Sequence, residues 1–199
     1  MEALRTDNRE LIGLERDAEA LVLARERAPE ATLLQVDLLN WLPPENMVRS
    51  VGLVAAGGDL LPLFLADDEL ALLMQLAARL VADDGLFAID ATRIDPVLFE
   101  KAARSQAWGV DGRWPSANGG VVVRESRLLP DPLGRPHVAQ LQIRHAQTGA
   151  DEYVDEREPF SVRAWSSAEI EEAASAAGFE IISRLSEDRF RWVLRSTHA

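Results

Sequence analysis

Two acidic residues, each at the end of an apolar run, have the types and the spacing best suited to chemistry in this sequence. Glu15 follows the apolar residues 11–14, and Asp37 follows the apolar residues 33–36. Carboxylates accept hydrogen bonds from hydroxyl and amino groups, such as those of a ribose or an adenine. We therefore interpret the two acids as candidate contacts to a nucleoside. Solvated strand ends would give the same pattern, and the spacing alone does not separate the two interpretations.

A helical stretch between the two acids predicts how they are positioned. Asp17 is placed to cap a helix that runs to Ala28 and is stopped by Pro29. Two apolar runs joined by such a helix predict a parallel βαβ unit, because parallel neighbours need a crossover connection. Ligands of open α/β sheets bind just beyond the carboxyl ends of the strands. The prediction therefore places Glu15 and Asp37 on one rim of a parallel sheet.

A third apolar run ends in a pair of glycines. Residues 51–55 predict a buried strand, and Ala56, Gly57 and Gly58 follow it. Glycines let the backbone approach a ligand closely. Making the turn is their commoner role, so both roles stay open for this pair.

Two further acids stand where a general base could lie. Asp59 follows the glycine pair, and Asp90 ends a strand predicted over residues 86–90. Between them, an apolar stripe predicts a helix over residues 67–81. A carboxylate at a strand end can act as a general base, but a capping or solvated carboxylate is commoner. The catalytic residue therefore stays unassigned.

The second half of the chain predicts an antiparallel region. A short helix is expected from Pro96 and a loop over residues 108–120. His145 falls on the apolar face of a strand and is interpreted as a packing residue, and the 3 histidines show no ligand spacing, so no metal site is predicted. Alternation and turn residues predict antiparallel strands over residues 120–128, 137–145 and 151–158.

The C-terminal stretch has clear local signals. Ser166 and Glu169 form a capping box for a helix that runs to Ala177. Residues 179–185 and 189–194 then predict a hairpin.

Length, composition and charge limit the class of protein. A chain of 199 residues fits one domain with a real core. The net charge of −12 argues against a nucleic-acid partner, because phosphate contacts need clustered Lys and Arg. The sequence has no apolar run long enough to span a membrane and no cysteine. We therefore expect a cytoplasmic protein with neither a nucleic-acid nor a membrane partner.

Several stretches together resemble the class I S-adenosylmethionine-dependent methyltransferases of small-molecule type. The resemblance implies an α/β, Rossmann-like fold with a mostly parallel sheet, a C-terminal antiparallel hairpin and an inserted antiparallel β segment. It implies a single domain over residues 1–199, in which 11–92 form the cofactor-side core, 93–160 cover the substrate and 161–199 form the last helix and hairpin. The matching stretches are residues 11–17, 33–38, 51–58, 80–86, 165–170 and 176–180.

The resemblance also implies S-adenosylmethionine as cofactor and assigns residues to it. Glu15 matches the acid that holds the ribose hydroxyls, and Arg16 lies beside it. Asp37 matches the acid near the adenine amino group, with Leu38 next to it. The loop beside the methionine part and the methyl group is matched by Ala56 and Gly57. The expected chemistry is in-line transfer of a methyl group to a small-molecule acceptor, and Arg163 and Trp165 are candidates to line the acceptor site, although packing is their default role.

One departure from the family pattern leaves alternatives open. The family's first strand and glycine-rich loop would lie upstream of Leu11, where this sequence has ten residues and no glycine. We expect either that the given chain starts late or that it is a degenerate member. In both cases residues 11–14 and 51–55 would pair directly, or another chain, as in a homo-oligomer, would fill the gap.

The alternative function is therefore a catalytically inactive methyltransferase-like binding or partner protein. A different nucleotide-binding enzyme that uses Glu15 for a ribose is disfavoured, because no G-x-G-x-x-G motif follows a predicted strand.

Overall fold

The computed structural model describes residues 10–116, 119–148, 153–186 and 189–197. The chain divides into two compact units, Met1–Met47 and Val48–Ala199. Residues 1–9, which precede the first predicted strand, lie outside the described residues.

The first unit is the predicted parallel βαβ arrangement. Strand β1 (Ile12–Glu15), helix α1 (Ala18–Arg27) and strand β2 (Thr32–Gln35) follow one another, and a short 3-10 helix η2 (Glu45–Met47) comes later. The two strands pair in parallel from Ile12 opposite Thr32 to Glu15 opposite Gln35. Asp17 caps α1, since its carboxylate accepts hydrogen bonds from the backbone N–H groups of Glu19 and Ala20.

The second unit contains a four-stranded mixed sheet in the order β10-β11-β4-β3. Strand β3 (Val51–Ala56) pairs in parallel with β4 (Val81–Thr92) through the crossover that contains the 3-10 helix η3 (Leu61–Leu63) and α2 (Asp67–Leu80). The hairpin of β10 (Phe179–Arg184) and β11 (Arg189–Ser196) adds two antiparallel strands. The predicted C-terminal hairpin is therefore confirmed.

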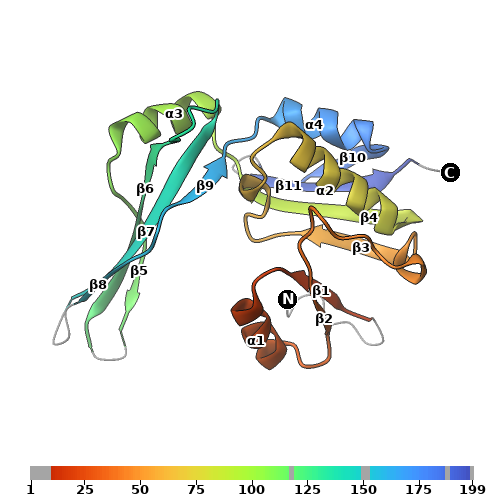
Figure 1. The fold of residues 1–199 in the computed structure, drawn as a ribbon, viewed down its shortest axis with the longest axis horizontal. Helices are drawn as coiled ribbons and strands as arrows, with labels where there is room; N and C mark the ends of the chain where they lie inside the picture. The colour runs from red at the N-terminus through yellow and green to blue at the C-terminus, as the bar shows by residue number, and fades with distance from the viewer. Residues whose placement is uncertain (1–9, 117–118, 149–152, 187–188, 198–199) are drawn as a thin grey trace. The chain divides into compact units, whose positions relative to one another are not determined.

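Helices α2 and α4 (Ser167–Ala176) lie on the same face of this sheet (Figure 1). The predicted apolar stripe of α2 is confirmed, because its inner residues are almost fully buried. This face carries the core between the helices and the four-stranded sheet, and its buried side chains include Leu70, Met74, Phe87, Ile170, Phe190 and Leu194.

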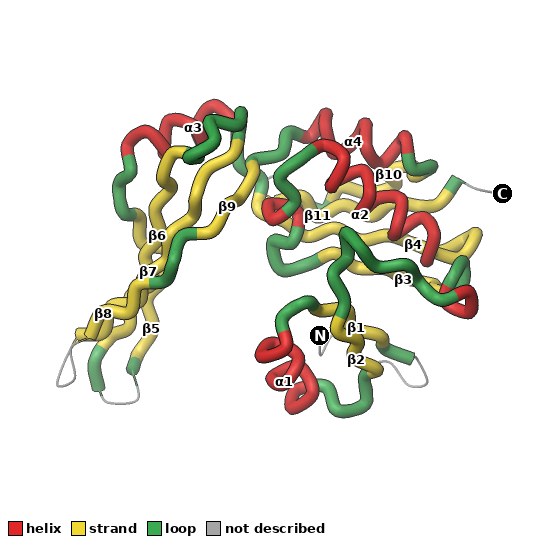
Figure 2. The backbone as a smooth tube through the Cα atoms, viewed as in Figure 1, coloured by secondary structure: helices red, strands yellow, loops and turns green. Residues whose placement is uncertain are grey.

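A second sheet is entirely antiparallel and has the order β5-β6-β7-β8, with β9 also paired to β7. Figure 2 shows its two long strands, β6 and β7, side by side. Helix α3 (Pro96–Ser105) contributes Phe99 and Ala103 to a small core with β7 and β9. The strands are β5 (Gly109–Pro115), β6 (Val121–Pro130), β7 (Val138–Thr148), β8 (Tyr153–Glu156) and β9 (Phe160–Arg163).

The structure corrects the prediction of a loop over residues 108–120. Residues Gly109–Pro115 form strand β5, which pairs with β6 along its length and has an irregularity at Val110 and Gly112. The strand β9 was not predicted. Both strands are short and have glycine or proline in or beside them, which favours a turn. They are extended because they pair with β6 and β7 across the sheet.

The fold is α/β as predicted, and the inserted antiparallel segment is present, but the mostly parallel sheet is not confirmed. Only β1–β2 and β3–β4 are parallel pairs in the described part of the chain, while the other strand pairs are antiparallel. The physical reason is that only helical crossovers return a strand in the same direction, whereas hairpins reverse it. In the described part of the chain, β1 pairs with β2 and β3 pairs with β4, and how the gap beside residues 11–14 and 51–55 is filled stays a prediction. None of the described helices is long and apolar enough to cross a membrane.

Candidate functional site

The two predicted acids lie at the same edge of the β1–β2 sheet. Glu15 is the last residue of β1 and pairs with Gln35, the last residue of β2, so Asp37 follows at the same carboxyl end. Oε1 of Glu15 accepts hydrogen bonds from the N–H groups of Arg16 (2.7 Å) and Asp17 (2.9 Å). The described hydrogen bonds of Glu15 use this one oxygen. Its Oε2 can therefore accept a hydrogen bond from a ligand hydroxyl.

Asp37 is half-buried and organises the turn that follows β2. Oδ1 accepts a hydrogen bond from the N–H of Leu39 (3.2 Å), and Oδ2 accepts one from Nδ2 of Asn40 (2.9 Å). Each carboxylate oxygen has a second lone pair, so Asp37 can still accept a hydrogen bond from an amino group. Leu38 is half-buried beside it.

Gln35 joins the ends of the two strands and was not singled out from the sequence. Its Nε2 donates a hydrogen bond to the carbonyl oxygen of Arg16 (3.2 Å). Arg16 itself is exposed. This bond holds the backbone around Glu15 against the end of β2.

The glycine loop of the second unit follows the end of β3. Ala56 is 4% exposed and lies opposite Ile89 of β4, while Gly57 and Gly58 are exposed. A Cβ atom built on either glycine would meet nothing within 4 Å, and Gly58 has φ +68°. The backbone of this loop is therefore open on its side-chain side.

A network of charged and polar side chains ties this loop to the ends of two strands. Oδ1 of Asp59 accepts hydrogen bonds from the N–H of Thr92 (2.5 Å), from the Thr92 hydroxyl (2.8 Å) and from Nη2 of Arg189 (3.0 Å). Arg189 also donates Nε to Oδ1 of Asp90 (2.7 Å), and Arg191 approaches the same oxygen (3.3 Å). Sequence reasoning found the two acids but missed Thr92 and Arg189, and no local signal marks either residue.

The hydrogen bond from Arg189, helped by Arg191, lowers the pKa of Asp90 below its ordinary value despite the opposing effect of burial. A carboxyl group with a lowered pKa takes up a proton less readily at neutral pH. Asp90 is therefore poorly suited to the role of general base that its strand-end position suggested.

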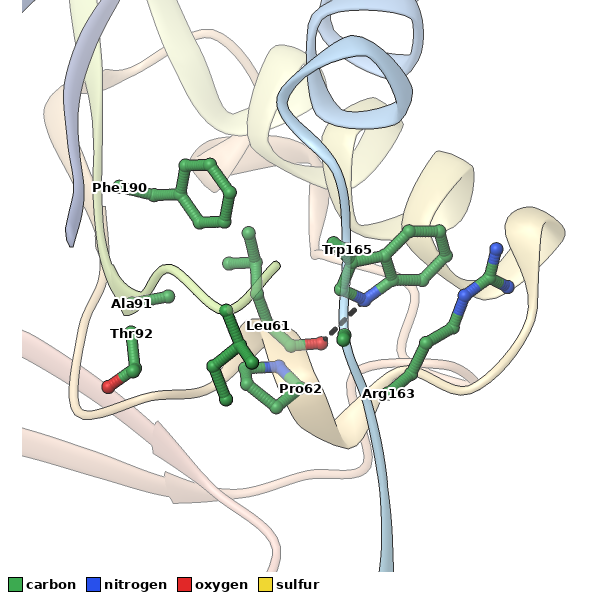
Figure 3. Close-up of a pocket in the computed structure, with 9 residues that line it drawn as sticks. Leu61, Pro62, Ala91, Thr92, Arg163, Trp165 and Phe190 are labelled. Carbon is green, nitrogen blue, oxygen red and sulfur yellow. Dashed lines mark hydrogen bonds between the residues drawn. The ribbon is translucent and has the colours of Figure 1, made fainter. Parts of the chain in front are cut away.

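A small pocket lies where β4 ends and the chain returns through β9. Figure 3 shows that apolar side chains form most of its wall. The sequence candidates Arg163 and Trp165 both line it. The complete lining is Leu61, Pro62, Ala91, Thr92, Ile94, Arg163, Ala164, Trp165 and Phe190.

Arg163 and Trp165 are also held firmly by their neighbours. The indole Nε1 of buried Trp165 donates a hydrogen bond to the carbonyl oxygen of Leu61 (3.0 Å). The Arg163 guanidinium stacks 3.6 Å from the centre of the Trp165 ring and pairs with Asp67 (2.7 Å) and Glu169 (2.8 Å). The pocket therefore offers a ligand an apolar and aromatic wall, because the positive charge of Arg163 is balanced by carboxylates.

No protein-family model matches the sequence, and no curated protein matches it significantly. Solved structures do match the fold. An S-adenosylmethionine-dependent methyltransferase from Clostridium acetobutylicum superposes with a TM-score of 0.70 at 13% identity, over 96% of this chain and 76% of that chain. DesVI from Streptomyces venezuelae matches with a TM-score of 0.71 at 17% identity, over 94% of this chain and 74% of that chain.

CalS10, an amino pentose methyltransferase from Micromonospora echinaspora that was solved with S-adenosylmethionine bound, matches with the same scores and coverage as DesVI: TM-score 0.71, 17% identity, 94% and 74%. The chain therefore has the fold of the class I S-adenosylmethionine-dependent methyltransferases, as its sequence stretches indicated.

Proposed function

We propose that this protein is an S-adenosylmethionine-dependent methyltransferase that acts on a small-molecule acceptor. The observation that carries the proposal is the pair of carboxylates, Glu15 and Asp37, at the carboxyl end of two parallel strands. This pair occurs in a chain with the methyltransferase fold, and one protein of that fold, CalS10, was solved with the cofactor bound. The net charge of −12 favours a small molecule over a nucleic acid as acceptor.

The proposed binding roles follow from the donors and acceptors at each position. Oε2 of Glu15 accepts hydrogen bonds from the ribose hydroxyls, and the backbone at Arg16 lies beside them. Asp37 accepts a hydrogen bond from the adenine amino group, and Leu38 gives apolar contact to the ring. The open backbone at Ala56 and Gly57 lies along the methionine part of the cofactor.

S-adenosylmethionine supplies the reactive methyl group on a sulfonium when it is bound. The chain positions the two reactants and keeps water out, and these two effects account for catalysis in such a reaction. The apolar wall around Trp165 and Phe190 holds the acceptor beside the end of β4. Residues 93–160 cover the acceptor, residues 11–92 bind the cofactor, and residues 161–199 complete the sheet. No general base is assigned.

Two further parts of the proposal concern the setting of the protein. A cytoplasmic location agrees with the absence of cysteine. A homo-oligomer agrees with the uncharged edge strand β3, whose sequence is Val-Gly-Leu-Val-Ala-Ala.

Calorimetric titration with S-adenosylhomocysteine tests the cofactor site. The exchange Glu15→Gln keeps an oxygen for the N–H groups of Arg16 and Asp17 but replaces the second acceptor oxygen with a donor. We expect this variant to bind about 10- to 100-fold more weakly, the equivalent of one charge-assisted hydrogen bond of about 1.5–3 kcal/mol. The matched control is Glu26→Gln on the exposed side of α1, which should bind like the wild type.

The outcomes separate the two candidate functions. A wild-type protein that does not bind S-adenosylhomocysteine would support the catalytically inactive partner protein instead. Equal binding by the wild type and Glu15→Gln would remove Glu15 from the site.

A further inference from the structure

We infer that Asp59 is a positioning residue, which fixes the backbone of Gly57 and Gly58 against the end of β4 and so preorganises the cofactor loop. The inference rests on the proposed function, because it concerns the same site. Asp59 has φ +60° and follows Gly58 at φ +68°, so two successive residues adopt the left-handed conformation. A left-handed conformation is uncommon for a non-glycine residue, although Asp adopts it more often than most. The side-chain contacts of Asp59 add to what holds the loop in this conformation.

These contacts begin where the strand pairing stops. The described β3–β4 register ends with Ala56 opposite Ile89. Beyond it, the Asp59 carboxylate accepts the backbone N–H of Thr92 at 2.5 Å. A side chain thus continues the connection between the two segments after the backbone ladder has ended.

The network around this carboxylate includes a third chain segment. The Thr92 hydroxyl donates to Oδ1 of Asp59 (2.8 Å) and accepts a hydrogen bond from Nη1 of Arg189 (3.0 Å). Arg189, at the start of β11, also pairs with Asp59 (3.0 Å) and Asp90 (2.7 Å). The loop after β3, the end of β4 and the start of β11 are therefore joined through one carboxylate oxygen.

The Coulombic part of this network has a modest effect on stability. The Asp59 side chain is 48% exposed, and ion pairs at exposed sites contribute little. The hydrogen bonds of Asp59 matter more for the loop, because they fix the direction of a backbone that has open space beside both glycines. A loop that is already ordered loses less conformational entropy on binding, and this raises its affinity.

Two variants of Asp59 separate positioning from charge. Asp59→Ala removes every bond of the side chain, and Asp59→Asn keeps an oxygen that can accept the N–H of Thr92. We expect Asp59→Ala to bind S-adenosylhomocysteine about tenfold more weakly, and Asp59→Asn to recover most of this loss. Amide hydrogen exchange at Gly57, Gly58 and Leu60 should be faster in Asp59→Ala than in the wild type, without any ligand present.

A matched control is Asp83→Ala, which breaks another exposed ion pair of the same unit, with Arg49 (2.7 Å). This variant should leave both the affinity and the exchange of the glycine loop unchanged. The inference would be overturned if amide exchange in the glycine loop of Asp59→Ala were as slow as in the wild type. It would also be overturned if exchange were faster but the variant bound S-adenosylhomocysteine as tightly as the wild type.

If the wild type itself does not bind S-adenosylhomocysteine, the proposed function fails. The exchange measurement then decides the inference alone, since it reports the order of the loop in the free protein.

Discussion

At the scale of single residues, the two adjacent glycines of the loop after β3 have different reasons to be glycine. Gly58 has φ +68°, whereas a Cβ atom on Gly57 would meet no protein atom within 4 Å and no left-handed φ is required there. Gly58 is therefore needed for the backbone conformation. At Gly57 the missing side chain leaves room for a ligand.

This difference predicts opposite effects of one substitution. Gly58→Ala should lower the free energy of unfolding by about 1–2 kcal/mol, because a left-handed conformation costs an L-residue about that much. Gly57→Ala should leave the unfolding free energy close to that of the wild type. It should weaken S-adenosylhomocysteine binding about tenfold or more, because the added methyl group would overpack the ligand, at a cost of about 1–3 kcal/mol. Urea denaturation and calorimetry measure the two effects, and full affinity in Gly57→Ala would show that the ligand does not lie against this residue.

At the scale of elements, helix α4 begins with a complete capping box. The hydroxyl of Ser166 accepts the N–H of Glu169 (3.2 Å), and Oε2 of Glu169 accepts the N–H of Ser166 (2.7 Å). Ser166→Ala should destabilise the protein by about 1 kcal/mol, because an N–H at the helix start loses its partner. Thermal denaturation checks this against Ser175→Ala, an exposed serine of the same helix. Equal melting temperatures for the two variants would contradict the capping role.

The turn between β6 and β7 depends on a buried carboxylate. The side chain of Asp131 is 1% exposed and accepts hydrogen bonds from the backbone N–H (2.9 Å), Nε (3.1 Å) and Nη2 (2.9 Å) of Arg135. Asp131→Ala should therefore cost about 2 kcal/mol, the range for hydrogen bonds to charged groups. The matched control is the exposed Asp84→Ala in β4, which should change the unfolding free energy very little in urea.

At the scale of the whole molecule, three carboxyl groups predict how stability depends on pH. Hydrogen bonds from Arg189 lower the pKa of Asp90, and hydrogen bonds from Arg135 lower the pKa of Asp131. For Glu169, burial raises the pKa, but the hydrogen bonds with Ser166 and Arg163 outweigh it, so the net pKa is lowered.

Because these pKa values are lower in the folded chain, the unfolded chain takes up protons first as the pH falls. The stabilisation is present above the unfolded pKa values, about 3.9 for Asp and 4.3 for Glu, and is lost as the pH falls through the folded values. The melting temperature should therefore drop steadily below pH 5. Asp131→Asn should show a shallower drop, and an identical pH profile would remove Asp131 from the set.

The edge strand β3 predicts self-association of the whole chain. It lies at one end of its sheet in the described structure, contains neither charge nor proline, and leaves Leu53 39% exposed. Such an edge pairs readily with a strand of another chain. Light scattering after size exclusion should show a mass that grows with concentration. Leu53→Lys should reduce it, whereas Leu72→Lys on α2 should not, and a monomer at every concentration would contradict the prediction.

The sequence by itself determined the local elements of this protein and the edge on which its two acids lie. Helix α1 with its Asp17 cap, the buried stripe of α2 and the Ser166 cap of α4 were all predicted, because periodicity and capping act within a few residues. The parallel β1–β2 pair was predicted as well, since a helix of that length between two apolar runs leaves few other connections.

Only the tertiary structure decided which distant segments meet. Strands β5 and β9 form because β6 and β7 pair with them. Most strand pairs are antiparallel because hairpins connect them, whereas the resemblance implied a mostly parallel sheet. Asp59 contacts Thr92, which is 33 positions away in the chain, and Arg189, which is 130 positions away. Hydrogen bonds between segments so far apart depend on how the strands are placed, and no local pattern in the sequence records that placement.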